Sequence, residues 1–192
     1  MLVGDQKQLG PTYSFKVEGP TSLYARLIQA GHPFDFLDIQ YRMHRSLMEV
    51  PNLLFYENRI RCGYVPNQDR RFMFSDSPFL FIDVPHGVEA KKGTSYFNMS
   101  EVDVIVGLKD LCLEAFERSK ILQKQNPTRP MMKFTKNDIY VITPYNAQKN
   151  AIAEYFAESE IDDQVISIDS SQGREFDLVF VSMVRTTPGM FV

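Results

Sequence analysis

Four polar clusters in this sequence follow apolar runs that predict β-strands. They are Gly4–Leu9, Gln40–His44, Thr143–Gln148 and Asp169–Glu175. Their side chains include an arginine, whose planar guanidinium suits anionic oxygens, and glutamines, whose amides both donate and accept hydrogen bonds. Ligands of an open parallel sheet bind outside the carboxyl ends of its strands, so these clusters are the candidates for a functional site.

Alternating apolar runs and turn residues predict a mostly parallel sheet with helices on both faces, which is an α/β fold. We expect strands at 1–4, 34–40, 79–84, 138–143, 164–168 and 178–184. We expect a first helix after Thr21 or Ser22 that ends at Gly31, and a second from 45 to 56 with an interruption or kink at Pro51. A third helix is expected after the capping-box residues Asn98 and Glu101, and a fourth from Pro144 to about Ser159. Segments 57–78 and 87–96 are expected to be irregular or loop.

Composition excludes several classes of protein. The chain has 192 residues, 44% of them hydrophobic, and a net charge of −3, which argues against disorder and against a polybasic binder. Its two cysteines and three scattered histidines offer no disulfide framework or zinc site, and no apolar run is long enough to span a membrane. No glycine pattern forms a P-loop or a Rossmann fingerprint.

The order of the four clusters resembles the second RecA-like domain of superfamily 1 helicases, in the group that includes the up-frameshift helicase of nonsense-mediated decay. Gly4–Leu9 with Pro11 is similar to that superfamily's G-D-x-x-Q-L-x-P motif. Gln40–His44 resembles Q-Y-R-M-H, with Pro51-Asn52 and Phe55-Tyr56 following in the family's spacing, and Val141–Tyr145 resembles I-T-P-Y. Gln172–Glu175 matches Q-G-R-E. Gly93–Tyr96 with Asn98 and Glu101 favours the up-frameshift branch.

The resemblance implies roles around ATP for the first two clusters. Arg42 is expected to neutralise the transferring γ-phosphate, the alternative being a surface ion pair. Gln8 is expected to sense the γ-phosphate or the attacking water, or else it caps the loop. Asp5 holds a magnesium-bound water or has only a structural role, and Tyr41 packs on the base or fills the core. His44 has no second ligand spaced to join it, so a metal or catalytic role is not expected there.

The last two clusters are assigned to the ribose and to nucleic acid. Glu175, after a tight turn at Gly173, is expected to accept a ribose hydroxyl, or else it caps a helix, and Arg174 is expected to form an ion pair that shapes the turn. A nucleic-acid phosphate is expected where a helix begins and nearby hydroxyls donate, which singles out Thr143, Pro144, Ser170 and Ser171. Thr143 is alternatively a plain N-cap. Close relatives carry an aromatic residue in place of Ser171.

The resemblance implies that residues 1–20 end a first RecA-like domain and that 21–192 form the second, truncated at its C-terminus. The expected function is ATP-driven translocation on single-stranded RNA, with a role in nonsense-mediated decay. The alternatives are a DNA helicase and a non-catalytic nucleic-acid or protein-binding module. Expected cofactors are ATP and Mg²⁺, bound mainly by the first domain, so the 192-residue piece alone is expected to be inactive. Expected partners are RNA or DNA, the first domain and decay-complex proteins, with no membrane, and the expected location is the cytoplasm, with the nucleus as a second site.

Overall fold

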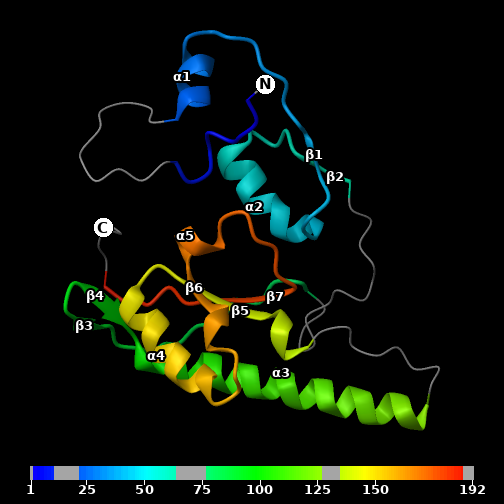
Figure 1. Ribbon diagram of the computed structural model, residues 1–192, viewed down its shortest axis with the longest axis vertical. Helices are drawn as coiled ribbons and strands as arrows, with labels where there is room; N and C mark the ends of the chain where they lie inside the picture. The colour runs from blue at the N-terminus through cyan, green and yellow to red at the C-terminus, as the bar shows by residue number, and fades with distance from the viewer. Residues whose placement is uncertain (1, 11–21, 64–76, 127–134, 188–192) are drawn as a thin grey trace. The chain divides into compact units, whose positions relative to one another are not determined.

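The computed structural model describes residues 2–10, 22–63, 77–126 and 135–187 (Figure 1). The chain divides into two compact units, Met1–Phe81 and Ile82–Val192, and each unit is described by itself. Within the described residues, no helix combines the length and the apolar character that a membrane crossing would need.

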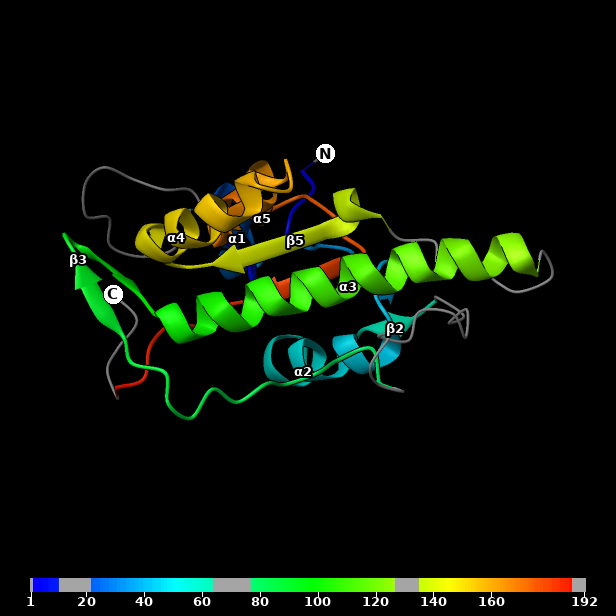
Figure 2. The same cartoon turned by 90° about the horizontal axis from the view of Figure 1, so that it is seen from below.

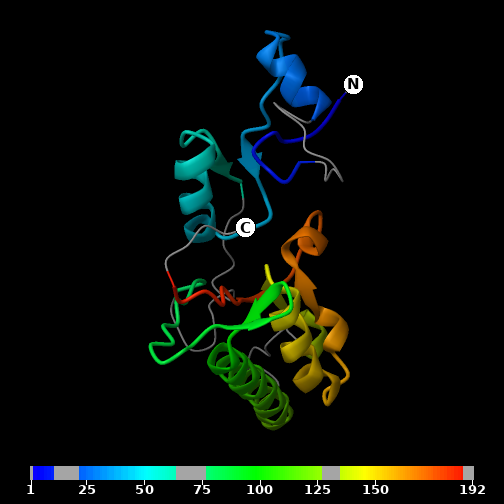
Figure 3. The same ribbon diagram turned by 90° about the vertical axis from the view of Figure 1, so that its left-hand side faces the viewer.

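The described residues of the first unit form two helices and a short parallel strand pair. Helix α1 (Leu23–Gln29) begins where the Ser22 hydroxyl accepts the N–H of Ala25 at 3.3 Å, and the chain leaves it through Gly31 at φ 81°. Strand β1 (Ile39–Gln40) pairs with β2 (Arg61–Cys62), and α2 (Arg45–Phe55) lies beside β1 (Figure 3). Pro51 lies inside α2 without interrupting it, although it removes one backbone donor.

The second unit is built on a three-stranded parallel sheet in the order β6-β5-β7. Its strands are β5 (Ile139–Thr143), β6 (Val165–Ser167) and β7 (Leu178–Val181). A hairpin of β3 (Ala90–Lys92) and β4 (Ser95–Phe97) leads into the long helix α3 (Met99–Gln125). Helix α4 (Asn146–Ala157) connects β5 to β6, the short α5 (Ile168–Ser171) follows β6, and 3₁₀ turns lie at Lys136–Asp138 and Asp162–Gln164.

The core of this unit lies between the sheet and helices α3 and α4, as Figure 2 shows. Alternate residues of β5 point into it, and Ile139 and Val141 are fully buried there. Val102 of α3 and Ile152 and Phe156 of α4 are also fully buried. The strands of this sheet pair in parallel and helices accompany them, so the α/β prediction is confirmed and is consistent with a RecA-like domain.

Several predicted elements differ in the structure. No strand forms at 79–84, where Phe79, Leu80 and Phe81 are exposed, and of the strand expected at 34–40 only β1 is present. The described part of the N-terminal strand, Leu2 to Gly4, is exposed coil. Two of the expected irregular segments contain strands instead, namely β2, and β3 with β4. Pro11 and Thr21, on which some expectations depended, lie outside the described residues.

Candidate nucleotide and nucleic-acid sites

Asp5 is the centre of a hydrogen-bonded cluster in the first unit. Its carboxylate accepts the Tyr56 hydroxyl at 2.6 Å, the Gln8 side-chain amide at 2.9 Å and the Lys7 backbone N–H at 2.9 Å. Its backbone carbonyl accepts the Tyr24 hydroxyl at 2.9 Å. The segment around Asp5 is therefore tied to both helices of the unit, because Tyr24 lies on α1 and Tyr56 follows α2.

These contacts set the protonation of the cluster. Partial burial acts to raise the pKa of Asp5, but the donated hydrogen bonds from Tyr56, Lys7 and Gln8 outweigh it and the pKa is lowered. Burial, followed by the hydrogen bond to Asp5, raises the pKa of Tyr56 to about 12. Asp5 is thus a carboxylate and Tyr56 a neutral donor at physiological pH. Asp5 and Gln8, predicted separately, are in direct contact.

The Gln40–His44 cluster forms a tight turn that one side chain shapes. The Gln40 amide oxygen accepts the backbone N–H groups of Arg42 and Met43, both at 2.9 Å, and its nitrogen donates to the Met43 carbonyl at 2.8 Å. His44 is the N-cap of α2, where its Nδ1 accepts the N–H of Ser46 at 3.2 Å. Arg42 is thereby held directly after the carboxyl end of β1, with its side chain exposed.

Tyr41 lies on the surface and not in a core. It is 68% exposed, so the alternative of a core residue is wrong. Its ring packs against Gly63, where an added Cβ would come within 2.5 Å of Tyr41 Cε1. A glycine at position 63 is therefore needed for the ring to lie along the backbone. The exposed ring is available for stacking on a base, which stays a prediction.

Thr143 and Pro144 lie at the carboxyl end of the central strand β5, just before α4. Pro144 was predicted at the first helical position, but the structure places Tyr145 as the N-cap and Asn146 as the first residue, so that prediction is wrong by two residues. Thr143 is buried, and its hydroxyl accepts the Tyr145 N–H at 3.5 Å. The helix is capped from outside, because the Ser95 hydroxyl on β4 accepts the N–H of Ala147 at 3.1 Å.

Ser170 and Ser171 lie on the short helix that follows the carboxyl end of β6. The hydroxyl of Ser167, the N-cap residue, accepts the Ser170 N–H at 3.2 Å and also donates to the Ser170 hydroxyl at 2.9 Å. Ser171 donates its hydroxyl to the Ile168 carbonyl at 2.6 Å. Since β5 and β6 are parallel neighbours, these serines and Thr143 lie at the same edge of the sheet. The structure thus brings together the four residues predicted to contact nucleic acid.

Glu175 lies elsewhere in this unit. After Gly173, which has φ 78°, the chain runs to the amino end of β7, and Glu175 lines a hollow of about 410 Å³ there. The other lining residues come from this loop and from the start of β5: Asn137, Asp138, Tyr140, Arg174, Phe176 and Asp177. Tyr140 and Phe176 stack at 3.9 Å between ring centroids. The carboxylate predicted to bind ribose therefore borders an aromatic hollow.

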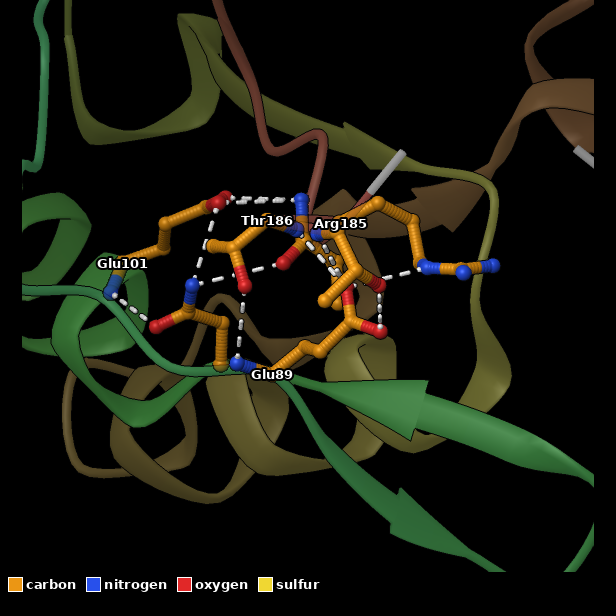
Figure 4. A network of polar contacts seen from close by, with 7 residues as sticks. Glu89, Glu101, Arg185 and Thr186 are labelled. Atoms are coloured by element: carbon orange, nitrogen blue, oxygen red, sulfur yellow. Dashed lines mark hydrogen bonds and ion pairs between the residues drawn. The ribbon is translucent and has the colours of Figure 1, made fainter. Parts of the chain in front are cut away.

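A polar network that the sequence pattern did not reveal joins α3, α4 and the end of β7 (Figure 4). The capping-box prediction is half correct. The Asn98 side chain accepts the Glu101 N–H at 3.3 Å, but the Glu101 carboxylate accepts the Val184 N–H at 2.9 Å and the Ser182 hydroxyl at 2.6 Å. The buried Gln148 accepts the Asn98 N–H at 2.8 Å and donates to the Ser182 hydroxyl at 2.9 Å.

The network holds a strained turn. Val184 has φ 69°, and the Arg185 N–H donates to the Met183 carbonyl at 2.7 Å, which is the geometry of a γ-turn centred on Val184. A β-branched residue at positive φ is unfavourable and persists only where its surroundings fix it. Glu101 fixes it from one side, and the Asn98 amide donates to the Val184 carbonyl at 3.3 Å from the other.

Glu89 anchors the residues that follow this turn. Its carboxylate accepts the Thr187 hydroxyl and the Thr186 N–H, each at 2.7 Å, and pairs with Arg185 Nε at 3.0 Å. Hydrogen bonds from Thr187 and Thr186 are the main reason that the pKa of Glu89 is lowered to about 2. Nothing in the local sequence indicated this contact, because Glu89 and Thr187 are 98 positions apart.

Mg²⁺ has one candidate oxygen ligand among the predicted residues. Within the described ranges, no group of three or more His, Cys, Asp and Glu side chains could hold a metal ion. The Asp5 carboxylate already accepts three hydrogen bonds, so it suits the outer-sphere role predicted for it better than direct coordination of the ion.

The family of the chain follows from comparison with known proteins. A family model described as an AAA domain matches residues 20–190. The chain belongs to this AAA domain family, in the up-frameshift group of superfamily 1 helicases. This confirms the family resemblance identified from the four clusters.

Its relatives include proteins from archaea, fungi and plants. The chain is 31% identical to an uncharacterised ATP-dependent helicase of Methanocaldococcus jannaschii and 31% identical to the ATP-dependent helicase upf1 of Schizosaccharomyces pombe. It is 34% identical to a homologue of regulator of nonsense transcripts 1 from Arabidopsis thaliana. Each match covers 97% of this chain but only 28%, 20% and 15% of the respective relative. The chain therefore spans less than a third of these proteins.

Proposed function

We propose that this chain is the second motor domain of an ATP-dependent RNA helicase and couples ATP hydrolysis to movement along a single strand. The observation that carries the proposal is the turn after β1, where Gln40 fixes the backbone and Arg42 projects at the carboxyl end of the strand. The family membership and the helicase names of the relatives support it.

In this proposal, ATP is held between this domain and a first RecA-like domain that ends near residue 20. Arg42 neutralises charge on the γ-phosphate as the bond to it breaks. Gln8 turns its amide from Asp5 to the phosphate or the attacking water, and Asp5 holds a water bound to Mg²⁺. Mg²⁺ supplies charge neutralisation at the phosphates. Glu175 and the turn at Gly173 hold the ribose, and Tyr41 stacks on the base.

Single-stranded nucleic acid is proposed to bind at the carboxyl edge of the β6-β5-β7 sheet. The Ser170 and Ser171 helix and the Thr143–Pro144 segment lie there side by side, and their contacts would be to the backbone and insensitive to sequence. RNA is favoured over DNA because the Arabidopsis thaliana relative is named a homologue of regulator of nonsense transcripts 1. A role in nonsense-mediated decay, decay-complex partners and action in the cytoplasm, with the nucleus as a second site, are part of the same proposal.

The test is ATP hydrolysis by the full protein that contains this chain, measured with and without single-stranded RNA. We expect stimulation by RNA and a loss of turnover of roughly 10³-fold for Arg42→Ala, the scale of other arginines that stabilise phosphoryl transfer. The matched control is Arg45→Ala, because Arg45 lies three residues away, is exposed and forms a surface pair with Glu49 at 3.7 Å.

Each alternative predicts a different result. Stronger stimulation by single-stranded DNA than by RNA of equal length would favour the DNA helicase. The motor proposal would be refuted if no nucleic acid stimulated ATP hydrolysis. It would also be refuted if the Arg42→Ala variant hydrolysed ATP as fast as the Arg45→Ala variant. A protein that binds nucleic acid without hydrolysing ATP would be the non-catalytic module.

A further inference from the structure

Two cationic side chains meet at one aromatic ring on the hairpin of the second unit. The Arg185 guanidinium lies 4.5 Å from the centroid of the Tyr96 ring, and the Lys91 ammonium lies 5.9 Å from it. Lys91 and Tyr96 are directly opposite each other in the β3–β4 pair, so their side chains share a face of the hairpin. We call Lys91, Tyr96 and Arg185 the hairpin patch.

The charges of the hairpin patch are not balanced. Glu89 is the one carboxylate that pairs with it among the described residues, and it contacts Arg185 through Nε alone. Figure 4 shows the rest of the guanidinium turned away from Glu89, and the side chain is 20% exposed. Lys91 is exposed and has no carboxylate within ion-pair distance in the described part of the chain. A net positive charge therefore remains, on a guanidinium whose pKa is raised first by the neighbouring Tyr145 hydroxyl and then by Glu89.

The hairpin patch is fixed at the sheet edge where the proposed function places nucleic acid. Arg185 follows the carboxyl end of β7, and β7 is the neighbour of β5 on the side away from β6. The hairpin is attached to the same edge, because Ser95 caps α4. Along this edge the order is Ser170 and Ser171 after β6, Thr143 and Pro144 after β5, and Arg185 after β7. The hairpin patch thus extends the edge by one strand.

We propose that the hairpin patch binds a phosphate of single-stranded nucleic acid and lengthens the strand's path beyond the Thr143–Pro144 segment. This inference rests on the proposed function. Arg185 is the main contact, held in place by Glu89 and by the turn at Val184, and Lys91 adds a second positive charge on the same face. Glu89 is a positioning residue, because it touches Arg185 and not the strand.

The experiment compares two adjacent lysines in the full protein. Lys91→Gln removes a charge from the face with Tyr96, whereas Lys92→Gln removes the same charge from the opposite face of the same strand. Binding of a fluorescent single-stranded RNA is measured without nucleotide at several salt concentrations between about 50 and 200 mM. Arg185→Gln is the second variant, and the Michaelis constant for ATP is measured for all three.

We expect Lys91→Gln to weaken RNA binding about threefold to fivefold and to reduce the salt slope by about 0.7, the change for one single-strand phosphate contact. Lys92→Gln should stay within about twofold of the unchanged protein, and Arg185→Gln should lose at least as much as Lys91→Gln. The Michaelis constant for ATP in saturating RNA should be unchanged in the Lys91 variant.

The possible failures point to different errors. Equal RNA affinity in the Lys91 and Lys92 variants would overturn the proposed RNA contact at the hairpin patch. If RNA still stimulated ATP hydrolysis, the motor proposal would stand. A raised Michaelis constant for ATP with unchanged RNA affinity would assign the phosphate to the nucleotide and also overturn the inference. An unchanged protein that binds no single strand would overturn the proposed function, and the inference with it.

Discussion

Glu101 provides the sharpest test of the structure, because one carboxylate holds the strained turn at Val184 from a helix far away in sequence. Replacing it by alanine removes the acceptor of the Val184 N–H and of the Ser182 hydroxyl. Val184 is 0% exposed and Ser182 is 1% exposed, so water cannot replace the lost acceptor without a rearrangement. The variant should therefore lose free energy of unfolding.

The magnitude follows from the two donors. A buried donor left without a partner costs about 1–3 kcal/mol, so two such donors cost about 2–6 kcal/mol. Relaxation of the positive-φ turn at Val184 returns part of this, since such strain is on the order of 1–3 kcal/mol. We expect a net loss of about 2–4 kcal/mol for Glu101→Ala. Glu101→Gln, which keeps one oxygen but adds two donors, should lose about 1–2 kcal/mol.

The assay is urea unfolding of the 192-residue chain at neutral pH, followed by circular dichroism. Glu114→Ala is the matched control, because it makes the same substitution at an exposed position of the same helix. We expect that control to stay within about 0.5 kcal/mol of the unchanged chain. Hydrogen exchange should show faster exchange at 182–187 for Glu101→Ala. If Glu101→Ala were no more destabilising than Glu114→Ala, the carboxylate would not hold the turn and the reasoning would be wrong.

Two further predictions concern titration and reactivity. Hydrogen bonds lower the pKa of Glu89 from 4.5 to about 2. The contribution of Glu89 to the free energy of unfolding should therefore be complete above pH 4.5 and should disappear as the pH falls from 4.5 to about 2. Urea midpoints measured across this range should depend less on pH for Glu89→Gln, and an equal dependence would contradict the assignment. Burial raises the pKa of Cys112 to about 11, so in the native chain a thiol reagent near neutral pH should modify the half-buried Cys62 first. Equal rates at the two cysteines would show that the helix opens readily.

The sequence predicted secondary structure best in segments whose own residue pattern specifies the element. Strand β5 and helices α1, α3 and α4 were anticipated within a few residues, because apolar periodicity and the capping residues Ser22 and Asn98 act locally. Short motifs correctly placed Arg42 after β1 and Thr143 at the carboxyl end of β5. Local pattern failed at 79–84, where an apolar run is exposed coil, and at the β3–β4 hairpin, whose β3 residues are all exposed and show no alternation.

The sequence by itself determined the family, the α/β class and the residue types available for ATP and nucleic acid, because these are written in short motifs and in local periodicity. Only the tertiary structure decided which groups meet. It turned the Glu101 carboxylate away from the predicted capping box toward Val184, 83 positions along, and paired Glu89 with Arg185, 96 positions along. Contacts at such separations depend on how the strands and helices pack. A carboxylate has no local signal that distinguishes a helix cap from a distant backbone N–H.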